Sequence, residues 1–450
     1  MIQTDFRNLV VGTETTIPLL NGTYVTAVNF DNAATTPPFY SVIKELNDFS
    51  PWYSSIHRGK GYKSAYSSEL YDKTRDLVKR FVNADREKDV VIYTKGTTES
   101  INMLSHVLKE DEDGRDVVIS TFMEHSSNDL PWRGKFKVEY VELDAWGRLS
   151  LEDLEARLRR NAGKVKLVTV TGVSNVTGYI NPVHTVARLA HHYGTQILVD
   201  GAQWVPHMRV DMKPFGSPEH IDFIAFSAHK MYAPYGIGVL IGPDSVFDKS
   251  MPLLQGGGAT RMVTHEHVEW DEPPARFEAG SPNIMGVVAL GAAIKTLSSI
   301  GMDTLYRYEQ QLLDYANAQM ARVPGIGMLR NPGKDGDRIG VIPFTLEGIH
   351  HSLLAAMLSY EAGIAVRNGF FCSHPYSQKL LGLTTADMKY FFDNPGARRP
   401  GLVRVSFGIY NQPAEIDRLV YALHTFAMNK EFFINKYSSR SFPYEISNDV

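Results

Sequence analysis

Two predicted strands in this sequence end in side chains that could do chemistry together. Residues 221–226 are nearly all apolar and predict a strand that is buried on both faces. Ser227, His229 and Lys230 then place a hydroxyl, an imidazole and an amine at its carboxyl end. A second apolar run ends in Asp200. A lysine beside a buried strand is costly to desolvate unless its pKa falls, and a lowered pKa is what a Schiff-base amine requires.

A carboxylate and a lysine at neighbouring strand ends meet the two main needs of pyridoxal phosphate chemistry. That cofactor needs a lysine imine and an acid beside its pyridine nitrogen. The segments VDGAQ (residues 199–203) and SAHKMYAPYGIGVL (residues 227–240) resemble the fold-type I pyridoxal phosphate enzymes of aminotransferase class V. Within that class the sequence is most similar to the group II cysteine desulfurases and the selenocysteine lyases.

The elements around these groups alternate between strand and helix. Apolar runs predict strands near residues 90–93, 117–120 and 166–171, and helices are expected over 67–82 and 183–193. This order favours a mainly parallel α/β sheet with helices on both faces and its chemistry at the carboxyl ends of the strands. From about residue 285 the pattern changes to long amphipathic helices followed by a few strands.

The resemblance, which runs from about residue 30 to 426, implies a two-domain chain. It predicts a large cofactor-binding domain over residues 28–285, built on a mainly parallel seven-stranded sheet. Residues 1–27 and 286–450 would form a smaller α+β domain. The segment of residues 376–400 is longer than its counterpart in the usual group II enzymes, and residues 429–450 form an extra tail. These two departures leave the substrate and any sulfur acceptor open.

A turn before one predicted helix has the composition of an anion site. Residues 94–100 read TKGTTES, so a glycine and the hydroxyls of Thr97 and Thr98 open that helix. A plain helix cap is the alternative, because Thr and Ser are favoured at N-caps. The resemblance assigns the cofactor phosphate to Thr97, Thr98, Ser227 and His229. It also implies that Ser281, in FEAGSPN where the family has Thr, reaches the phosphate of the other subunit.

Other cofactor and substrate residues are assigned by the resemblance alone. His125 matches the imidazole that stacks on the cofactor ring, although a lone histidine at a strand end is more often structural. Gln203 would tune the phenolic oxygen, and Asn175 would touch both this oxygen and the substrate carboxylate. Asn32 and Ala33, in VNFDNAATTPP, match the small-residue turn near the substrate, and the segment His57–Gly59 matches one that reaches toward the partner subunit.

The single cysteine of the chain stands in a segment that resembles the nucleophile loop of the desulfurases. Cys372 lies in VRNGFFCSHP, and by itself a lone cysteine is more often an inert, buried side chain. In the context of the family it is the expected nucleophile, with Arg367 and His374 near it to favour the thiolate. Arg404 matches the arginine that clamps the substrate carboxylate, and Arg367 is a second candidate; both could instead be surface ion-pair residues.

Composition sets limits on the other classes of function. The chain has 450 residues, 43% of them hydrophobic and 21% charged, with a net charge of −4, which gives no case for nucleic acid or an anionic membrane. No apolar run approaches the roughly 20 residues of a membrane span. One cysteine permits no intrachain disulfide and no cysteine-rich zinc site, and no metal is expected. The sequence favours a reducing, cytoplasmic compartment.

The resulting hypothesis is a homodimeric enzyme that removes sulfur from cysteine to give alanine and a persulfide on Cys372. Lys230 would carry the cofactor and move the α-proton, Asp200 would hold the pyridine nitrogen, and a sulfur-acceptor protein is a possible partner. A selenocysteine lyase or another C–S lyase is the nearest alternative. A class V aminotransferase or epimerase stays open because fold alone does not determine chemistry. From a different class, a non-catalytic sulfur-relay scaffold is also considered.

Overall fold

The structure is a computed structural model that describes residues 5–329 and 337–438, and it divides into two compact units. The first unit contains residues 1–36, 174–180 and 304–450, and the second contains residues 37–173 and 181–303. The domain boundaries expected at residues 27/28 and 285/286 stay a prediction. These units differ from them in giving residues 28–36 and 174–180 to the first unit and residues 286–303 to the second.

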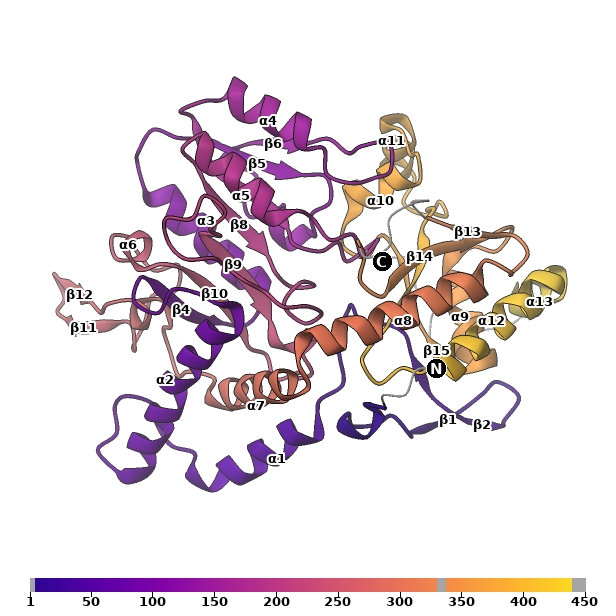
Figure 1. Ribbon diagram of the computed structural model, residues 1–450, viewed down its shortest axis with the longest axis horizontal. Coiled ribbons are helices and arrows are strands. Elements are labelled where there is room, and N and C mark those ends of the chain that lie inside the picture. The colour runs from indigo at the N-terminus through magenta and orange to yellow at the C-terminus, as the bar shows by residue number, and fades with distance from the viewer. Residues whose placement is uncertain (1–4, 330–336, 439–450) are drawn as a thin grey trace. The chain divides into compact units, whose positions relative to one another are not determined.

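The second unit is built on one seven-stranded sheet (Figure 1). Its strand order is β4-β10-β9-β8-β7-β5-β6, and every neighbouring pair from β9 to β6 is parallel, whereas β10 is antiparallel to both of its neighbours. The expected α/β fold with a mainly parallel seven-stranded sheet is therefore confirmed. The strands are β4 (Asp89–Thr94), β5 (Val117–Thr121), β6 (Lys137–Val141), β7 (Val165–Thr171), β8 (Gln196–Asp200), β9 (Phe223–Ser227) and β10 (Gly238–Pro243).

The central strands are apolar because both faces of the sheet are covered. Every residue of β7 and β9 is buried, as is every residue of β8 after Gln196. Parallel sheets in α/β proteins are covered by helices on both sides, so their strands read as continuous apolar runs instead of alternating patterns. In the parallel register Thr171 lies beside Asp200, and Asp200 lies beside Ala225. This register brings the carboxyl ends of three strands to one edge.

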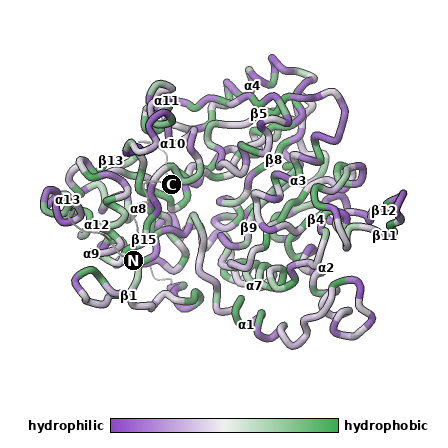
Figure 2. Tube along the Cα trace, turned by 180° about the vertical axis from the view of Figure 1, so that it is seen from behind, coloured by the Kyte–Doolittle hydropathy of each residue, from purple (hydrophilic) through white to green (hydrophobic). Residues whose placement is uncertain are grey.

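Helices pack on this sheet and on one another. α3 packs on β9 and β10, α5 packs on β8, and α7 packs against α1 and α2 (Figure 1). Figure 2 colours α7 largely green, in keeping with its apolar sequence. The helices of this unit are α1 (Tyr40–Phe49), α2 (Tyr62–Val82), α3 (Thr97–Glu110), α4 (Leu151–Arg160), α5 (Val183–His192), α6 (Asp244–Phe247) and α7 (Ile284–Ile300), and a hairpin is formed by β11 (Thr260–Val263) and β12 (Val268–Trp270).

Local sequence signals explain where several helices begin and end. α2 ends at Asn83, whose φ of 53° is the left-handed conformation that Asn adopts more readily than most residues. α4 begins after Ser150, whose hydroxyl accepts a hydrogen bond from the Asp153 N–H at 3.2 Å.

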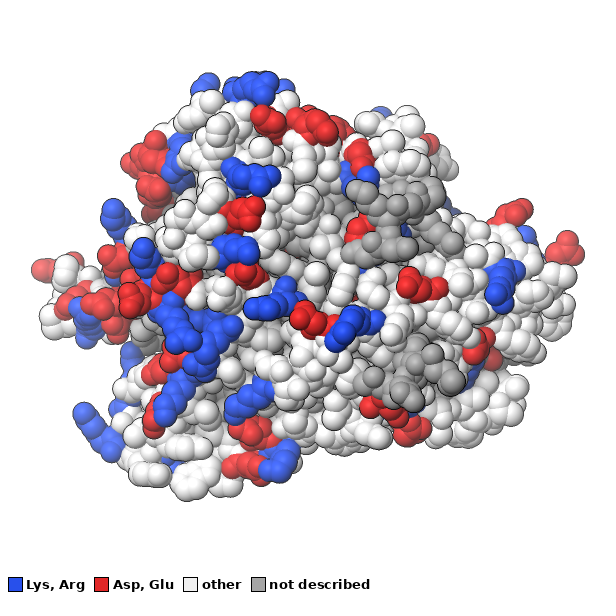
Figure 3. Space-filling model, viewed as in Figure 1, with Lys and Arg blue, Asp and Glu red and all other residues white. Residues whose placement is uncertain are grey.

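Figure 3 shows Lys and Arg interspersed with Asp and Glu on one face of the molecule. Pairs one helical turn apart, such as Arg157 with Asp153 at 2.7 Å, contribute to this pattern.

The first unit has a four-stranded antiparallel sheet in the order β13-β14-β17-β16. α9 packs against three of these strands and against α12. A short parallel pair, β3 with β15, ties the N-terminal segment to this unit. Its elements are β1 (Thr16–Pro18), β2 (Tyr24–Thr26), β3 (Val28–Asn29), α8 (Met302–Met320, which begins at the end of the second unit), β13 (Ile326–Met328), β14 (Val341–Leu346), α9 (His351–Ala362), β15 (Ile364–Ala365), β16 (Arg367–Gly369), α10 (His374–Leu380), α11 (Thr385–Asp393), β17 (Leu402–Ser406), α12 (Pro413–Met428) and α13 (Lys430–Ser438).

The two segments that depart from the family pattern each contain helices in their described parts. The segment 376–400 contains most of α10 and all of α11, which has no buried residue and exposes Tyr390 and Phe392. The tail 429–450 begins with α13, and its residues 439–450 lie outside the described residues. Within the described part of the chain no single helix is long and apolar enough to cross a membrane, and only α7 and α8 taken together, with a bend between them, reach that length.

Candidate active site

The second unit places Asp200 and Lys230 at neighbouring strand ends. Asp200 is the last residue of β8 and is 3% exposed. Lys230 is half-buried and ends the short 3₁₀ turn that follows β9. Burial raises the pKa of Asp200, while the Ala202 N–H, which donates to Oδ1 at 2.9 Å, and the charge of Lys230 lower it. The two side chains therefore act on each other electrostatically within one unit.

The N-terminus of α3 lies beside the end of β9. The Thr97 N–H donates to the Ser227 hydroxyl at 2.8 Å, and the two hydroxyl oxygens lie 2.7 Å apart. The N-cap residue is Gly96, which has no side chain to cap the helix. A Cβ at Gly238 would collide with the backbone of Gly96, so only glycine lets β10 pass this turn. N–H groups and hydroxyls at an open helix N-terminus suit an anion.

Two histidines, His125 and His229, flank this region. Burial, with the nearby positive charge of Lys230, lowers the pKa of His229 to about 4, so His229 is neutral at physiological pH. The Nδ1 atom of His125 accepts a hydrogen bond from the Ser127 N–H at 3.1 Å, which leaves the proton of the neutral ring on Nε2. The Ser127 hydroxyl also lies 2.6 Å from the Thr98 hydroxyl. The orientation of His125 is thus linked to the first turn of α3.

These groups fit a ligand with a cationic ring nitrogen, an aldehyde and an anionic tail. The carboxylate of Asp200 suits the ring nitrogen, the amine of Lys230 suits the aldehyde, and the N-terminus of α3 with Ser227 suits the anion. Gln203 is buried in the turn directly after β8. Eight of the predicted site residues lie on four parts of the second unit, namely the N-terminus of α3, the turn after β5, and the ends of β8 and β9 with the turns that follow them: Thr97, Thr98, His125, Asp200, Gln203, Ser227, His229 and Lys230.

The first unit holds the single cysteine in an unusual loop. Phe371 and Cys372 have φ values of 53° and 55°, in the left-handed region that residues other than Gly rarely occupy. The side chain of Asn175 stabilises this loop from both sides of the cysteine. Its Nδ2 donates to the Phe371 carbonyl at 2.8 Å, and its Oδ1 accepts from the Ser373 hydroxyl at 2.8 Å. The Cys372 side chain is half-buried.

Arg404 is a buried cation near this loop. It is 2% exposed, its Nη2 donates to Asp31 Oδ1 at 2.7 Å, and its Nη1 donates to the Asn175 carbonyl at 3.0 Å. Its guanidinium lies 5.0 Å from the centre of the Phe371 ring. Burial lowers the pKa of Arg404, and the Asp31 carboxylate opposes that effect. The buried Nε–H has no hydrogen-bond partner among the described residues, which suits an incoming carboxylate.

Two of the remaining predicted substrate residues in the first unit, Asn32 and Ala33, form hydrogen bonds with Ser406 of β17. Asn32 Nδ2 donates to the Ser406 carbonyl at 3.0 Å, and the Ala33 N–H donates to the Ser406 hydroxyl at 2.9 Å. These bonds fix the N-terminal turn against β17, which carries Arg404. Arg367 lies opposite Arg404 in the antiparallel register of β16 and β17. The direct contacts with substrate expected for Asn32, Ala33 and Arg367 stay predictions.

A cavity of about 800 Å³ gathers the segments that the resemblance assigns to the subunit contact. His57, Arg58 and Ser281 all line it. The loop that carries Ser281 is anchored by Glu278, whose two carboxylate oxygens accept from Arg75 at 2.8 and 2.7 Å. Three separate parts of the sequence therefore meet on one surface of the second unit.

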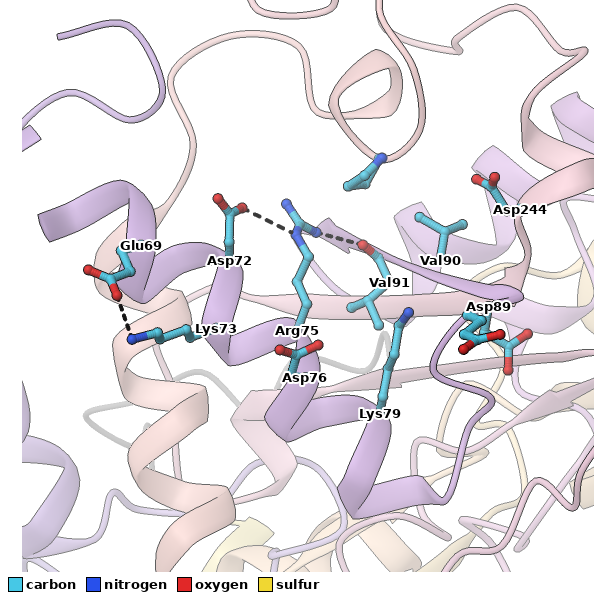
Figure 4. Close-up of a pocket in the computed structure, with 12 residues that line it drawn as sticks. Glu69, Asp72, Lys73, Arg75, Asp76, Lys79, Asp89, Val90, Val91 and Asp244 are labelled. Atoms are coloured by element: carbon cyan, nitrogen blue, oxygen red, sulfur yellow. Dashed lines mark hydrogen bonds and ion pairs between the residues drawn. The ribbon is translucent and has the colours of Figure 1, made fainter. Parts of the chain in front are cut away.

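A second cavity, of about 510 Å³, contains none of the predicted site residues (Figure 4). Its cations already have partners: Lys73 lies 2.5 Å from Glu69, and Arg75 donates to the Val91 carbonyl at 2.6 Å. Figure 4 shows Arg75 between Asp72 and Val91, with further carboxylates of Asp76, Asp89 and Asp244 around the cavity. Its cations are engaged and acids outnumber them, so this cavity lacks the groups that the predicted chemistry needs.

Several residues of these sites were not singled out from the sequence. Asp31, Ser127 and Ser373 each bond to a predicted site residue, and Glu124 lies directly before His125. Asn175, predicted as a cofactor and substrate contact, has its amide engaged with the Cys372 loop. Short polar residues beside the motifs were the only available signal, and that signal also describes ordinary turns.

Comparisons with known proteins agree with this architecture. The family model described as aminotransferase class-V matches residues 28–419. A cysteine desulfurase from Haloferax volcanii is 36% identical over 403 residues, which cover 88% of each chain. The structure of a cysteine desulfurase from Thermococcus onnurineus has a TM-score of 0.79 and 31% identity, covering 90% of this chain and 95% of that one. The structure of a cysteine desulfurase from Escherichia coli has a TM-score of 0.76 and 28% identity, with the same coverage.

Proposed function

Because the chain belongs to the aminotransferase class-V family, we propose that it is a pyridoxal phosphate-dependent cysteine desulfurase. The observation that carries this proposal is the environment of its only thiol. Cys372 stands on a loop in the left-handed conformation, beside a buried arginine whose Nε–H has no partner among the described residues. Strained backbone at a reactive residue is a recurring feature of functional sites. The similarity to cysteine desulfurases over 88% of the chain agrees with it.

The cofactor assignment follows from the residues of the second unit. Lys230 would bind the cofactor aldehyde, Asp200 would hold the ring nitrogen, and His125 would cover the ring. Thr97, Thr98, Ser227 and His229 would hold the phosphate, and Gln203 would contact the phenolic oxygen. When bound, pyridoxal phosphate supplies an electron-withdrawing ring that stabilises negative charge at the substrate carbons.

The residues of the first unit would act on the substrate. Arg404 binds the substrate carboxylate through its unused N–H, and Arg367 adds a second positive charge. The Cys372 thiolate attacks the sulfur of cysteine, so that an S–S bond forms while the C–S bond breaks. The carbon keeps the electron pair of the broken bond and takes up a proton, for which Lys230 and His125 are the candidate donors. The products are alanine and a persulfide on Cys372.

A homodimer completes this proposal. His57, Arg58 and Ser281 line one cavity on the surface of the second unit, and the family resemblance assigns these segments to the neighbouring subunit's site. Ser281 is exposed and keeps the hydroxyl needed to donate to a phosphate. The proposal expects that the active species in sedimentation experiments is a dimer and that a monomer is inactive.

Mass spectrometry of the protein after incubation with cysteine tests the function directly. We expect an added mass of one sulfur atom on Cys372 and release of one alanine for each sulfur transferred. Cys372→Ser should abolish alanine formation while pyridoxal phosphate still binds, because the hydroxyl is a far weaker nucleophile toward sulfur. If Cys372→Ser keeps full activity on cysteine, the persulfide mechanism is wrong. Loss of cysteine activity with retained selenocysteine activity would favour a selenocysteine lyase.

A further inference from the structure

The second unit contains a fully buried carboxyl group that the proposed reaction does not use. Glu124 is 2% exposed and lies between the end of β5 and the turn that holds His125. Among the described residues it forms no salt bridge. Burying a carboxyl group without a cation is costly unless hydrogen bonds compensate. The hydrogen bonds of Glu124 must therefore offset the cost of burying its carboxyl group.

Three hydrogen bonds hold the Glu124 side chain, each from a different element. Oε1 accepts from the Thr121 hydroxyl at 2.6 Å and from the Thr171 N–H at 3.0 Å, and Oε2 accepts from Asn128 Nδ2 at 2.6 Å. Thr121 ends β5, Thr171 ends β7, and Asn128 ends the 3₁₀ turn that His125 caps. The carboxyl group thus joins two strand ends to the turn that carries His125.

The network continues beyond the first partners. Asn128 Oδ1 accepts from the Thr169 hydroxyl at 2.7 Å and from the indole N–H of Trp132 at 3.2 Å. Both amide atoms of Asn128 are therefore committed, and their orientation is fixed. A network in which every member is satisfied holds its backbone in one arrangement.

Glu124 is also connected to Asp200 through the sheet. Thr171, whose N–H donates to Glu124, lies beside Asp200 in the parallel register of β7 and β8. Burial is the main cause that raises the pKa of Glu124 to about 8; its three hydrogen bonds oppose this rise, and the charge of Asp200 adds a smaller contribution to it. Lys230 is the cation acting on Asp200, and Asp129 and His125 are the other titratable groups on the turn.

We propose that Glu124 is a positioning residue for the reaction, whose hydrogen bonds fix His125 relative to the strand end that carries Asp200. This inference rests on the proposed function, because it uses the roles given there to His125 and Asp200. Glu124 itself touches no reacting atom in this proposal. It acts through the backbone of residues 125–128 and through Thr171.

The main experiment compares Glu124→Ala with the isosteric Glu124→Gln. Glu124→Ala should lower kcat by about 10²-fold with KM little changed, because a misplaced reactive group costs roughly this factor. It should also shift the visible absorbance maximum of the holoenzyme, since the ring that His125 covers is the chromophore. Glu124→Gln should stay within about tenfold of the wild type. Its amide can keep all three bonds if the Asn128 amide turns over. The Thr169 hydroxyl would then accept from Asn128 instead of donating to it, and the 3.2 Å bond from Trp132 would be lost.

Asp222→Asn is the matched control for a merely structural role. Asp222 is a buried carboxyl directly before β9. It accepts from the Ile197 N–H at 2.9 Å, at the opposite, amino end of β8, and lies 2.8 Å from His191 Nε2. This variant should lower the melting temperature without changing the absorbance maximum. A Glu124→Ala variant that behaves in the same way would reduce Glu124 to a structural residue and overturn the proposal. So would Glu124→Gln losing as much activity as Glu124→Ala, because an amide that can keep the same hydrogen bonds would then fail to replace the carboxyl group.

A double-mutant cycle with His125→Ala tests the route of the effect. If Glu124 acts through His125, adding Glu124→Ala to His125→Ala should lower kcat by less than about threefold further. A full further loss of about 10²-fold would contradict the proposal.

Should Glu124→Ala fail to fold, Thr121→Val removes one donor from the same carboxyl group and should give a smaller shift of the same kind. Failure of the wild type to bind pyridoxal phosphate would instead refute the proposed function.

Discussion

The two sets of site residues are positioned by different physical means. In the second unit, Asp200 and Lys230 stand at the ends of β8 and β9, and the hydrogen-bond register of a parallel sheet determines their places. In the first unit, Cys372 stands on a left-handed loop that the Asn175 side chain holds on both sides. Backbone register is shared by many residues, whereas the loop depends on a few side-chain bonds.

This difference predicts how each set responds to substitution. A side chain at a strand end can be replaced without moving the strand, so its loss should affect chemistry more than structure. A loop that is held by one amide should change its conformation when that amide is removed, because left-handed residues cost about 1–3 kcal/mol each when nothing compensates. The four predictions below compare the two sets, from the largest expected effect to the smallest.

Lys230→Ala should give the largest loss, about 10⁴-fold or more in alanine formation from cysteine, with an unchanged fold. The amine is the only group in the proposal that binds the cofactor covalently, and it also moves a proton. Borohydride reduction of the wild type should attach the cofactor permanently to Lys230, as peptide mapping would show. Lys95→Ala, which removes an exposed lysine near the N-terminus of α3, should behave like the wild type. Attachment of the cofactor to any other lysine would contradict the assignment.

Asp200→Asn should lower cysteine turnover by about 10²- to 10⁴-fold, because the ring nitrogen loses its partner. Burial raises the pKa of Asp200, so the folded protein without cofactor loses stability as the pH rises through the unfolded-state pKa toward the folded-state pKa. The cofactor-free variant should therefore melt at the same or a higher temperature than the wild type at pH 7. Turnover and melting are measured on the same preparations. A variant with lower stability and normal turnover would place Asp200 outside the cofactor site.

Arg404→Lys should raise KM for cysteine by about 10- to 100-fold and change kcat less. Lysine cannot donate to Asp31, to the Asn175 carbonyl and to a substrate carboxylate in the planar arrangement that a guanidinium provides. Arg367→Lys is the matched control on the neighbouring strand and should raise KM by less. Steady-state kinetics with cysteine measure both increases in KM. A larger increase for Arg367→Lys would make Arg367, and not Arg404, the main ligand of the substrate carboxylate.

Asn175→Ala should slow persulfide formation by about tenfold and leave the affinity for pyridoxal phosphate unchanged. The substitution removes the donor to the Phe371 carbonyl and the acceptor of the Ser373 hydroxyl. Asn181→Ala removes a comparable buried bond, from Nδ2 to the Thr171 carbonyl at 2.8 Å, and should lower stability without this kinetic effect. If Asn175→Ala weakens cofactor binding more than persulfide formation, the cofactor contact expected from the family resemblance is the more important role.

The sequence indicated most strands of the large sheet, although not β6, and much of the set of site residues in the second unit. Buried parallel strands are continuous apolar runs, so the runs ending at Asp200 and Ser227 could be placed on β8 and β9 before any coordinates. The boundary expected after residue 285 stays a prediction, because α7 belongs to the second unit. α2 begins at Tyr62, five residues before the predicted start, because its first turn follows a glycine and lacks a strong capping signal.

Only the tertiary structure decided which side chains hold the chemistry in place. Asn175 and Phe371 are 196 positions apart in the chain, and Glu124 and Thr171 are 47 positions apart. Their hydrogen bonds therefore follow from the fold and not from a local sequence pattern. The left-handed backbone at Cys372 was equally hidden, since neither Phe nor Cys favours that conformation. Strand composition is determined by burial, which a sequence displays residue by residue. Long-range polar contacts depend on the meeting of distant segments, which a single sequence does not display.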